Sequence, residues 1–417
     1  MSKHSLSRFV LFFALFSGSI LIMATPPKQS SSKFFKVDGQ QLKAPNGKPF
    51  LIQGINLGNW VNPEGYMFLF NNVSSFRLID QALKELVGAD ETNRFWQQFQ
   101  EKYITKNDIH YIRQTGMNSI RLPFHYKLFT REDYMGANNE NRGFELIDRV
   151  IGWCKAEGLS VILDMHDAPG GQTGDNIDDS YGYPYLFENK NDQTLFCSIW
   201  KRIAKHYANE TAIIGYDLLN EPIAHYFSNK DELNKLLEPI YKMATASIRE
   251  VDKNHIVILG GAQWDGNFTV FNDWKFDDQM MYTCHRYWCD TLQANVQDFV
   301  DFRNKTNRPI YMGETGENTD TWVNAYRKLL EMNKIGWHFW PYKKLEKTSC
   351  MVSVKPPVGW DKIVEFTKKD RSSFEKIREA KPSVTETRAI LKQLLENIEF
   401  ENCLKNDGYI KALGKQP

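Results

Sequence analysis

The segment IIGYDLLNEP, at residues 213–222, carries the pattern from which the rest of the chain can be interpreted. Its apolar first half predicts a short buried strand, and Pro222 ends that strand because proline has no N–H group for a strand ladder. The strand therefore delivers Asn220 and Glu221 at its carboxyl end. Burying a carboxyl group in such a place is costly unless the group has a partner or a chemical role.

A second segment of the same form, RPIYMGE at residues 308–314, follows later in the chain. It is an apolar run that ends in Glu314, just as the first run leads to Glu221. We interpret these two glutamates as the two halves of one acid/base site. That interpretation requires a fold that brings the ends of the two strands together.

Apolar runs that predict strands alternate with amphipathic runs, whose apolar residues recur at three- and four-residue steps and predict helices. The predicted strands are 50–57, 117–122, 159–165, 212–219, 256–259, 280–284, 309–313 and 335–340. The predicted helices are 92–116, 143–158, 192–207, 231–251, 292–303, 319–332 and 383–395. Eight strands alternating with helices predict an α/β protein built as a (β/α)8 TIM barrel. An open doubly wound sheet is the alternative, but no glycine-rich phosphate loop follows the first strand.

The chain begins with a segment that predicts export. A basic start is followed by an apolar run from Phe9 to Ala24, which is short for a membrane span and typical of a secretory signal peptide. We therefore expect a signal peptide at 1–24, a linker at 25–33 and a secreted, extracellular or periplasmic protein. An uncleaved membrane anchor is the alternative.

One barrel domain is expected over residues 34–405. It should open with a β-hairpin at 34–49, because two turn signals, Asp38-Gly39 and Asn46-Gly47, interrupt an alternating pattern. We expect a long polar loop from the first strand to about residue 90, and a C-terminal tail at 406–417.

The composition excludes some classes of function. The net charge is +1 with 25% charged residues, so we expect no nucleic-acid partner and no anionic membrane partner. The six cysteines form no C-x-x-C motif, which argues against a zinc or redox site, and they can be disulfides or buried thiols. We expect a monomer that needs no metal and no cofactor.

Polar side chains gather where the predicted strands end. In a barrel of this kind the active site lies at the carboxyl ends of the strands. Each of these residues alone could be a surface cation, a core imidazole or a core aromatic, but their common position predicts one site. The residues are Arg121, His166, Asn220, Glu221, His285, Tyr287, Glu314 and Trp340.

Two carboxyl groups in one cup suit the hydrolysis of a glycosidic bond. A retaining enzyme holds them about 5–5.5 Å apart and an inverting enzyme about 6.5–9.5 Å apart, with one protonated and the other ionised. We expect Arg121 to keep Glu314 ionised and Tyr287 to donate a hydrogen bond to the same carboxylate. Asn220 is expected to bind the sugar 2-hydroxyl group. The alternative is a structural ion-pair network.

The motifs resemble those of the family 5 glycoside hydrolases, the large cellulase-type family. The resemblance covers nearly the whole mature chain, and it implies that Glu221 is the acid/base, that Glu314 is the nucleophile and that the configuration is retained. The matching motifs are GINLGNW at 54–60, IRLP at 120–123, His166, NEP at 220–222, HRY at 285–287, GE at 313–314 and FW at 339–340.

Among the subgroups, the chain is most similar to the exo-β-1,3-glucanase type. That similarity implies that Glu64 binds substrate, and that the loop HDAPGGQTG at 166–174 lines the site. The chain departs from the subgroup at Asn59, where a glycine is usual, and in the loops DNIDDS at 175–180 and TGEN at 315–318. The resemblance therefore implies the reaction more firmly than the substrate.

The expected function is that of a secreted retaining β-glycosidase acting on a β-glucan-type polysaccharide or oligosaccharide. The alternatives are a β-mannan or glycolipid hydrolase, a barrel that only binds carbohydrate, and a metal- or phosphate-dependent barrel enzyme. The acidic loop at Asp175, Asp178 and Asp179 could hold calcium, bind sugar hydroxyls or be solvated. The candidate platforms for sugar stacking, or else core residues, are Trp60, Trp264, Trp288 and Trp360.

Overall fold

The computed structural model describes residues 1–2 and 33–417. The predicted signal peptide (1–24) and linker (25–33) therefore lie outside the described residues, except at their outer ends. All the elements described below belong to one compact unit within Ser32–Pro417. Among the described helices, none combines the length and the apolar character that are needed to cross a membrane.

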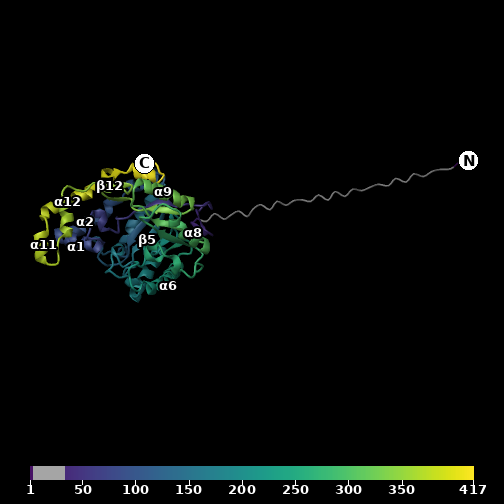
Figure 1. Ribbon diagram of the computed structural model, residues 1–417, viewed down its shortest axis with the longest axis horizontal. Helices are drawn as coiled ribbons and strands as arrows, with labels where there is room; N and C mark the ends of the chain where they lie inside the picture. Colours follow the sequence, from purple (N-terminus) through teal and green to yellow (C-terminus); the bar gives the residue numbers. More distant parts are fainter. Residues whose placement is uncertain (3–32) are drawn as a thin grey trace. The chain divides into compact units, whose positions relative to one another are not determined.

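The centre of this unit is a closed barrel of eight parallel strands (Figure 1), which confirms the predicted α/β class and (β/α)8 TIM barrel. The order around the barrel is β10-β3-β4-β5-β6-β7-β8-β9, so successive strands are neighbours and β10 closes the ring on β3. The strands are β3 (Gln53–Asn56), β4 (Ser119–His125), β5 (Ser160–Asp167), β6 (Ile213–Asp217), β7 (Ile256–Gly260), β8 (Met280–His285), β9 (Ile310–Glu314) and β10 (Gly336–Phe339).

The barrel strands form because both of their faces are covered. Every residue of the eight strands is buried except Gln53 and Ser160, which are half-buried. A strand that is buried on both faces appears in the sequence as a nearly continuous apolar run, which explains why such runs predicted all eight.

A small hairpin precedes the barrel, as predicted. Its strands are β1 (Lys36–Asp38) and β2 (Gln41–Lys43), which pair antiparallel. Phe35 and Leu42 belong to the same buried apolar cluster as Ile214, Tyr311 and other residues near the amino ends of the barrel strands. The hairpin therefore completes the core at the end of the barrel opposite the predicted site.

The outer layer consists of helices that connect the strands. The predicted helices after β4, β5, β6, β8 and β9 are all present, and a very short helix follows β7. They are α4 (Arg142–Glu157), α5 (Lys190–Tyr207), α6 (Lys230–Arg249), α7 (Ala262–Asp265), α8 (Ala294–Thr306) and α9 (Asp320–Met332). The structure also has short 3-10 helices, of which η1 (Gly65–Phe68) and η3 (Asn176–Asp178) lie near the site.

The helix predicted at 92–116 is in fact two helices, α2 (Ala89–Tyr103) and α3 (Lys106–Gln114). The break comes at Thr105, whose backbone N–H donates to the Asp108 carboxylate at 2.7 Å. This contact belongs to a capping box, in which a residue before the helix and one in its first turn satisfy each other's N–H groups.

A third helix, α1 (Phe76–Val87), occupies the region where a polar loop was predicted. Its buried residues Ile79, Leu83 and Leu86 lie on one face at four- and three-residue steps. That face packs beside α2 and α12 (Val384–Asn397), and Figure 1 shows these helices together at one side of the barrel. The prediction of a loop there was wrong because the apolar spacing was overlooked.

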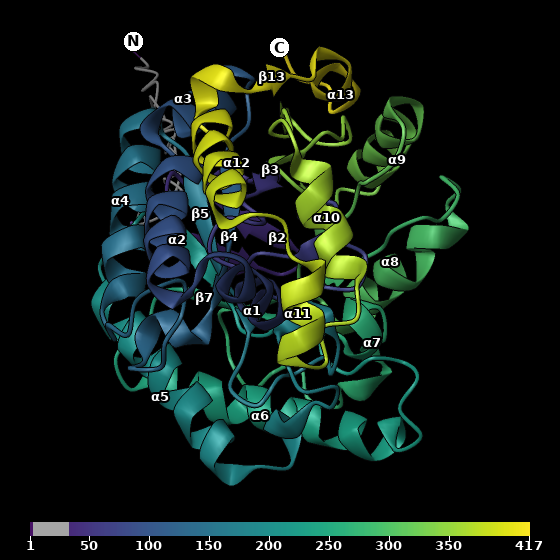
Figure 2. The same ribbon diagram turned by 90° about the vertical axis from the view of Figure 1, so that its left-hand side faces the viewer.

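A C-terminal extension follows the barrel and lies over it in Figure 2. It forms a three-stranded sheet in which β12 pairs with both β11 and β13, and four helices. Its elements are β11 (Lys343–Leu345), β12 (Val352–Val354), α10 (Trp360–Lys368), α11 (Phe374–Ala380), α12, β13 (Leu404–Lys405) and α13 (Asp407–Ala412).

The prediction that 406–417 is a tail was wrong. This segment contains α13, which packs against α9 and buries Tyr409 and Ile410. The signal was weak because α13 has only six residues. Its contacts with distant elements, rather than its own helical propensity, hold such a short helix in place.

Candidate active site

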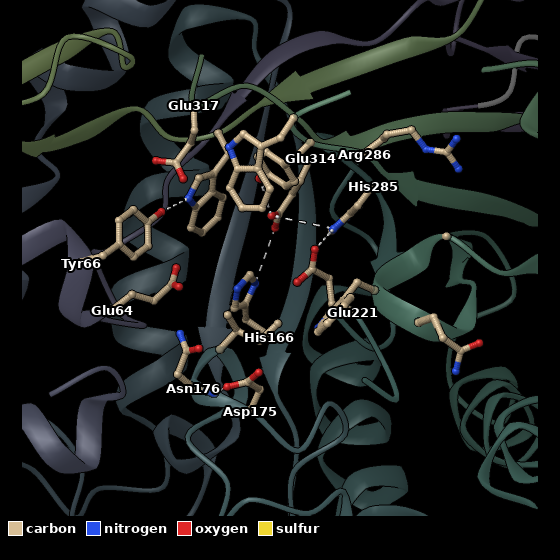
Figure 3. A pocket seen from close by; sticks show the side chains of 17 residues that line it. Glu64, Tyr66, His166, Asp175, Asn176, Glu221, His285, Arg286, Glu314 and Glu317 are labelled. Carbon is tan, nitrogen blue, oxygen red and sulfur yellow. Dashed lines mark hydrogen bonds and ion pairs between the residues drawn. The ribbon is translucent and has the colours of Figure 1, made fainter. Parts of the chain in front are cut away.

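A cleft of about 690 Å³ opens at the carboxyl ends of the barrel strands (Figure 3). Seven residues predicted for the site line it: Glu64, His166, Glu221, His285, Tyr287, Glu314 and Trp340. Two more predicted platforms, Trp264 and Trp288, line it as well. The remaining lining residues are Tyr66, Asp175, Asn176, Ile177, Gln263, Gly266, Arg286 and Glu317.

The two predicted catalytic glutamates face each other across His285. Glu314 is the last residue of β9, and Glu221 follows β6 with a left-handed backbone, at a φ of 47°. A carboxylate oxygen of Glu221 lies within 4.8 Å of one of Glu314. His285 Nδ1 lies 2.9 Å from Glu221 Oε1 and 3.8 Å from Glu314 Oε2, and Figure 3 shows both carboxylates directed at this imidazole.

Glu314 receives two hydrogen bonds. Arg121 Nη1 donates to its Oε1 at 2.5 Å, and the Tyr287 hydroxyl donates to its Oε2 at 3.0 Å. Burial raises the pKa of Glu314, while the charge of the Arg121 guanidinium acts to lower that pKa. Both donors favour the ionised form of this carboxyl group.

Glu221 has a different environment. Burial raises the pKa of Glu221 to about 7, and within residues 33–417 its side chain has only His285 as a hydrogen-bonding partner. Burial also lowers the pKa of His285 to about 3, so this imidazole is neutral near pH 7. A carboxyl group with such a pKa can hold a proton at neutral pH and release it on demand.

Arg121 lies beneath the cleft, where it contacts Glu314, and it is completely buried. Besides Glu314, it contacts Asp164 at 3.0 Å and Asp217 at 2.9 Å, and it donates to Asn220 Oδ1 at 3.0 Å. Burial raises the pKa of Asp164 and of Asp217 to about 7. The Arg121 guanidinium thus contacts three carboxyl groups, two of which have a pKa near neutrality.

Asn220 is buried below the lining of the cleft. Its amide lies between Arg121 and His166, whose Nε2 is 3.2 Å from Asn220 Nδ2. The predicted contact of Asn220 with a sugar 2-hydroxyl group stays a prediction.

An aromatic wall lies beside Glu314. The His166 and Trp340 rings stack with 5.4 Å between centroids and 10° between planes. The Trp340 indole N–H donates to the Tyr66 hydroxyl at 2.7 Å, which ties this wall to η1. The wall offers a flat apolar face and two polar edges to a ligand.

Glu64 and Glu317 lie on the same side of the cleft as Tyr66 (Figure 3). Burial raises the pKa of Glu64 well above its usual range, and the nearby carboxyl groups of Glu314 and Glu317 raise it further. Glu317 in turn pairs with Lys344 Nζ at 2.5 Å. Glu64 therefore offers a carboxyl group to a ligand, and its predicted role in substrate binding is a proposal.

The four tryptophans singled out as platforms divide into two pairs. Trp264 and Trp288 line the cleft, and Trp288 is 74% exposed. Trp60 and Trp360 are buried in the core, where their indole N–H groups donate to backbone carbonyls at 2.8 and 2.9 Å. Of the two alternatives given by the sequence, platform or core residue, Trp60 and Trp360 are therefore core residues, because their rings are covered by protein.

The acidic loop after β5 uses its carboxylates internally. Asp178 accepts three backbone N–H groups of the same loop, and Asp179 accepts the backbone N–H of Arg77 at 2.8 Å. Asp175 accepts the Tyr226 hydroxyl at 2.7 Å and is the only one of the three that lines the cleft. These contacts indicate that the carboxylates shape the loop.

Among the described residues, two groups of three side chains have ligand atoms close enough to share a metal ion, and both include Glu314. Since Arg121 already contacts Glu314, a cation there would meet a guanidinium, and we identify neither group as a metal centre. The expectation of no metal and no cofactor stays a prediction. The groups are Asp164–His166–Glu314 and Glu221–His285–Glu314.

Residues 79–345 match the cellulase family, glycosyl hydrolase family 5. This chain belongs to that family.

It is 30% identical to a beta-xylosidase of Phanerodontia chrysosporium, over 70% of this chain and 59% of the xylosidase. It is 28% identical to endoglucanase C of Acetivibrio thermocellus, over 59% of this chain and 86% of that enzyme. It is 26% identical to a probable glucan 1,3-beta-glucosidase A of Aspergillus clavatus, over 65% and 66% of the two chains.

Membership of family 5 makes this chain a glycoside hydrolase, which confirms the predicted class of enzyme. The sequence indicated Glu317 only as part of the TGEN loop, and Tyr66, Gln263 and Gly266 were missed as lining residues. Tyr66 lies two residues after Glu64, so proximity to a predicted residue was the available signal. Gln263 lies in a backbone of unusual conformation that no sequence pattern announces.

Proposed function

We propose that the chain is a secreted retaining β-glycosidase that hydrolyses a β-glucan-type polysaccharide or oligosaccharide by double displacement. The observation that supports this most directly is the distance of at most 4.8 Å between carboxylate oxygens of Glu221 and Glu314. Retaining enzymes hold their two carboxyl groups about 5–5.5 Å apart, whereas inverting enzymes leave about 6.5–9.5 Å for a water molecule.

The surroundings of the two groups support the assignment of roles. Glu314 is bonded by Arg121 and Tyr287, so it is the better candidate for the ionised nucleophile. Glu221 contacts no lysine or arginine among the described residues and has a pKa of about 7, which suits an acid that must later act as a base.

The reaction then has two steps. In the first, a Glu314 carboxylate oxygen attacks the anomeric carbon while Glu221 gives its proton to the departing glycosidic oxygen. In the second, Glu221 takes a proton from water, whose oxygen attacks the anomeric carbon and releases Glu314. Each step inverts the anomeric centre, so the sequence retains its configuration.

Two observations support a glucan as substrate. Two of the relatives named above are an endoglucanase and a glucan glucosidase. The cleft also has the size of a typical small-ligand site, and the exposed ring of Trp288 offers a surface on which a sugar can stack. A β-mannan, a glycolipid, and carbohydrate binding without turnover are the other outcomes that the test distinguishes.

The test is sugar release by the purified mature chain from β-1,3-, β-1,4- and mixed-linkage glucans, mannan, xylan, a glycolipid and aryl β-glycosides. We expect turnover of a β-glucan, no turnover by Glu314→Gln, and a β-anomer as the first product seen by NMR. An α-anomer as first product would contradict retention. Turnover of only mannan or the glycolipid would replace the substrate, and glycan binding without turnover would favour a binding protein.

Secretion is proposed on the sequence of residues 1–24 alone. We expect the exported protein to begin near residue 25. N-terminal sequencing of protein from the medium or periplasm tests this, and a chain that stays intact in the membrane fraction would favour the anchor.

A further inference from the structure

Asp265 is a buried carboxyl group beside the cleft that the two steps above do not use. It is fully buried at the end of α7, and its Oδ1 has no hydrogen-bonding partner among the described atoms. Its Oδ2 lies 3.2 Å from the backbone N of Glu221, which donates to it. The same Oδ2 lies 3.3 Å from Nε2 of His285.

The backbone around Asp265 is shaped to hold this carboxyl group. Gln263, Trp264 and Asp265 have consecutive left-handed φ angles of 50°, 56° and 57°. Such conformations are unfavourable for residues other than glycine, and they persist where the surrounding structure enforces them. A side chain at Gly260 would place its Cβ 1.8 Å from Asp265 Oδ1, so only glycine leaves room for the carboxyl group.

His285 joins Asp265 to the proposed acid/base. Its Nδ1 lies 2.9 Å from Glu221 Oε1, and its Nε2 lies 3.3 Å from Asp265 Oδ2. A neutral imidazole carries one N–H group, so the nitrogen that holds the proton determines the direction of both contacts. The protonation of Asp265 therefore controls what His285 presents to Glu221.

The charge balance of the site favours a neutral Asp265. Four buried carboxyl groups, those of Asp164, Asp217, Asp265 and Glu314, and the half-buried Glu221 lie around Arg121, whose guanidinium contacts Asp164, Asp217 and Glu314. Several uncompensated buried charges would be very costly, so some of these groups must be protonated. Burial and the neighbouring Asp217 raise the pKa of Asp265 well above its usual range.

We propose that Asp265 is a positioning residue which, in its neutral form, donates to Nε2 of His285 and keeps the imidazole proton on Nδ1, facing Glu221. Glu221 Oε1 then accepts this N–H, and Oε2 is free to carry the proton to the leaving oxygen. In the second step the same N–H stabilises the carboxylate that takes a proton from water. This inference rests on the proposed role of Glu221.

The first measurement determines directly which nitrogen of the His285 imidazole carries the proton. NMR of the full chain with 15N-labelled histidine, at pH 6 and pH 8, should show His285 neutral, with the proton on Nδ1 and none on Nε2. The loss of a signal in His285→Gln assigns it. A proton on Nε2, or a charged imidazole, would overturn the proposal. This measurement needs no turnover, so failure of the proposed glycosidase activity would leave it interpretable.

The second measurement is the pH dependence of kcat/KM in Asp265→Ala. An Nδ1–H bond favours the ionised form of Glu221, so its loss should raise the pKa of Glu221 and move the alkaline limb to higher pH. An ionised Asp265 would act oppositely, because removing a negative charge lowers that pKa. The charged and titratable groups around this pair are Glu64, Arg121, Asp164, His166, Asp175, Asp217, Tyr241, Cys284, His285, Tyr287 and Glu314.

In Asp265→Ala we also expect kcat to fall by about tenfold for unactivated glycosides and by less for activated aryl glycosides, which need less help from the acid.

Gly260→Ala should displace the Asp265 carboxyl group and shift the alkaline limb in the same direction, which covers the case that Asp265→Ala does not fold. Asp252→Ala is the matched control, because Asp252 contacts His255 Nδ1 at 2.6 Å outside the cleft. A limb that moves to lower pH, or stays in place, in a folded variant contradicts the proposal.

Discussion

Glu221 and Glu314 are the same residue type in the same cleft, but the protein treats them differently. Glu314 ends a regular strand and accepts hydrogen bonds from Arg121 and Tyr287. Glu221 sits on a left-handed backbone and contacts a neutral imidazole. The difference indicates that hydrogen-bond donors, rather than residue type, distinguish the two proposed roles, which are the nucleophile for Glu314 and the acid/base for Glu221.

The largest expected effect comes from exchanging each carboxyl group for an amide. Glu314→Gln should lower kcat/KM by about 10⁴-fold or more on every substrate, because no covalent intermediate can form. Glu221→Gln should lower it strongly for natural glycosides but much less for aryl glycosides with good leaving groups. Initial rates on both substrate types check this, and equal losses for the two variants would remove the distinction between the two sites.

Arg121→Lys should have the next largest effect. A lysine cannot reproduce the separate contacts to Glu314, Asp164 and Asp217, so we expect kcat/KM to fall by about 10²–10³-fold, together with a lower Tm. Thermal unfolding and kinetics measure both. Arg249→Lys, which keeps its charge beside Asp277 far from the cleft, is the matched control. Unchanged kinetics would show that Arg121 serves the core alone.

The Tyr287→Phe substitution tests one of the two hydrogen bonds that distinguish Glu314 from Glu221. Losing one hydrogen bond to a carboxylate should cost about 1.5–3 kcal/mol, or roughly tenfold to a hundredfold in kcat/KM. It should also raise the pKa of Glu314, so the acidic limb of the pH profile moves to higher pH while the alkaline limb stays. Tyr207→Phe, which removes a similar bond to Asp148, is the control. A shift of the alkaline limb instead would place Tyr287 on the Glu221 side.

The smallest effect concerns stability. The pKa of Glu221 is about 7 in the folded chain, well above its ordinary value, so the folded state keeps a proton that the unfolded state has already released. This contribution is lost as the pH rises through 7. The buried histidines, whose pKa values are lowered, act in the opposite direction but only below their ordinary pKa of about 6.5.

The Tm of the wild type should fall between pH 6.5 and pH 8, and in Glu221→Gln this fall should be smaller by about 2 °C. Scanning calorimetry measures the difference. Glu101→Gln is the control, because the pKa of Glu101 is lowered and the group stays ionised throughout this range. A slope that Glu221→Gln leaves unchanged would show that Glu221 titrates well below neutral pH, as a solvated glutamate does.

The barrel could be predicted from the sequence because of how its strands are buried. A strand covered on both faces has to be apolar throughout, so IIGYD and IYMGE stand out, and the residues just past each run lie at one end of the barrel. Glu221, His285 and Glu314 could be found in this way. His285 and Glu314 are the last residues of β8 and β9, and Glu221 follows the end of β6 by four residues.

The errors concern features that depend on contacts between distant segments. Whether a tryptophan is a platform or a core residue depends on what covers its faces, and Trp60 and Trp288 look alike in the sequence. Asp265 is held by three left-handed residues and by a glycine five positions earlier, and neither forms a recognised motif. The short helix α13 is stabilised by α9, so its own sequence gave little signal.

The C-terminal segment has a consequence for how this enzyme can be handled. Asn406 is hydrogen-bonded to the loop before β12 through both its backbone and its side chain, and the Tyr409 hydroxyl reaches the backbone carbonyl of Trp340 at 3.5 Å. These hydrogen bonds hold the C-terminal residues against the backbone of Trp340, whose side chain lines the cleft. Affinity tags and fusion partners at this end therefore belong beyond Pro417, since trimming the last residues would remove contacts that support the wall formed by His166 and Trp340.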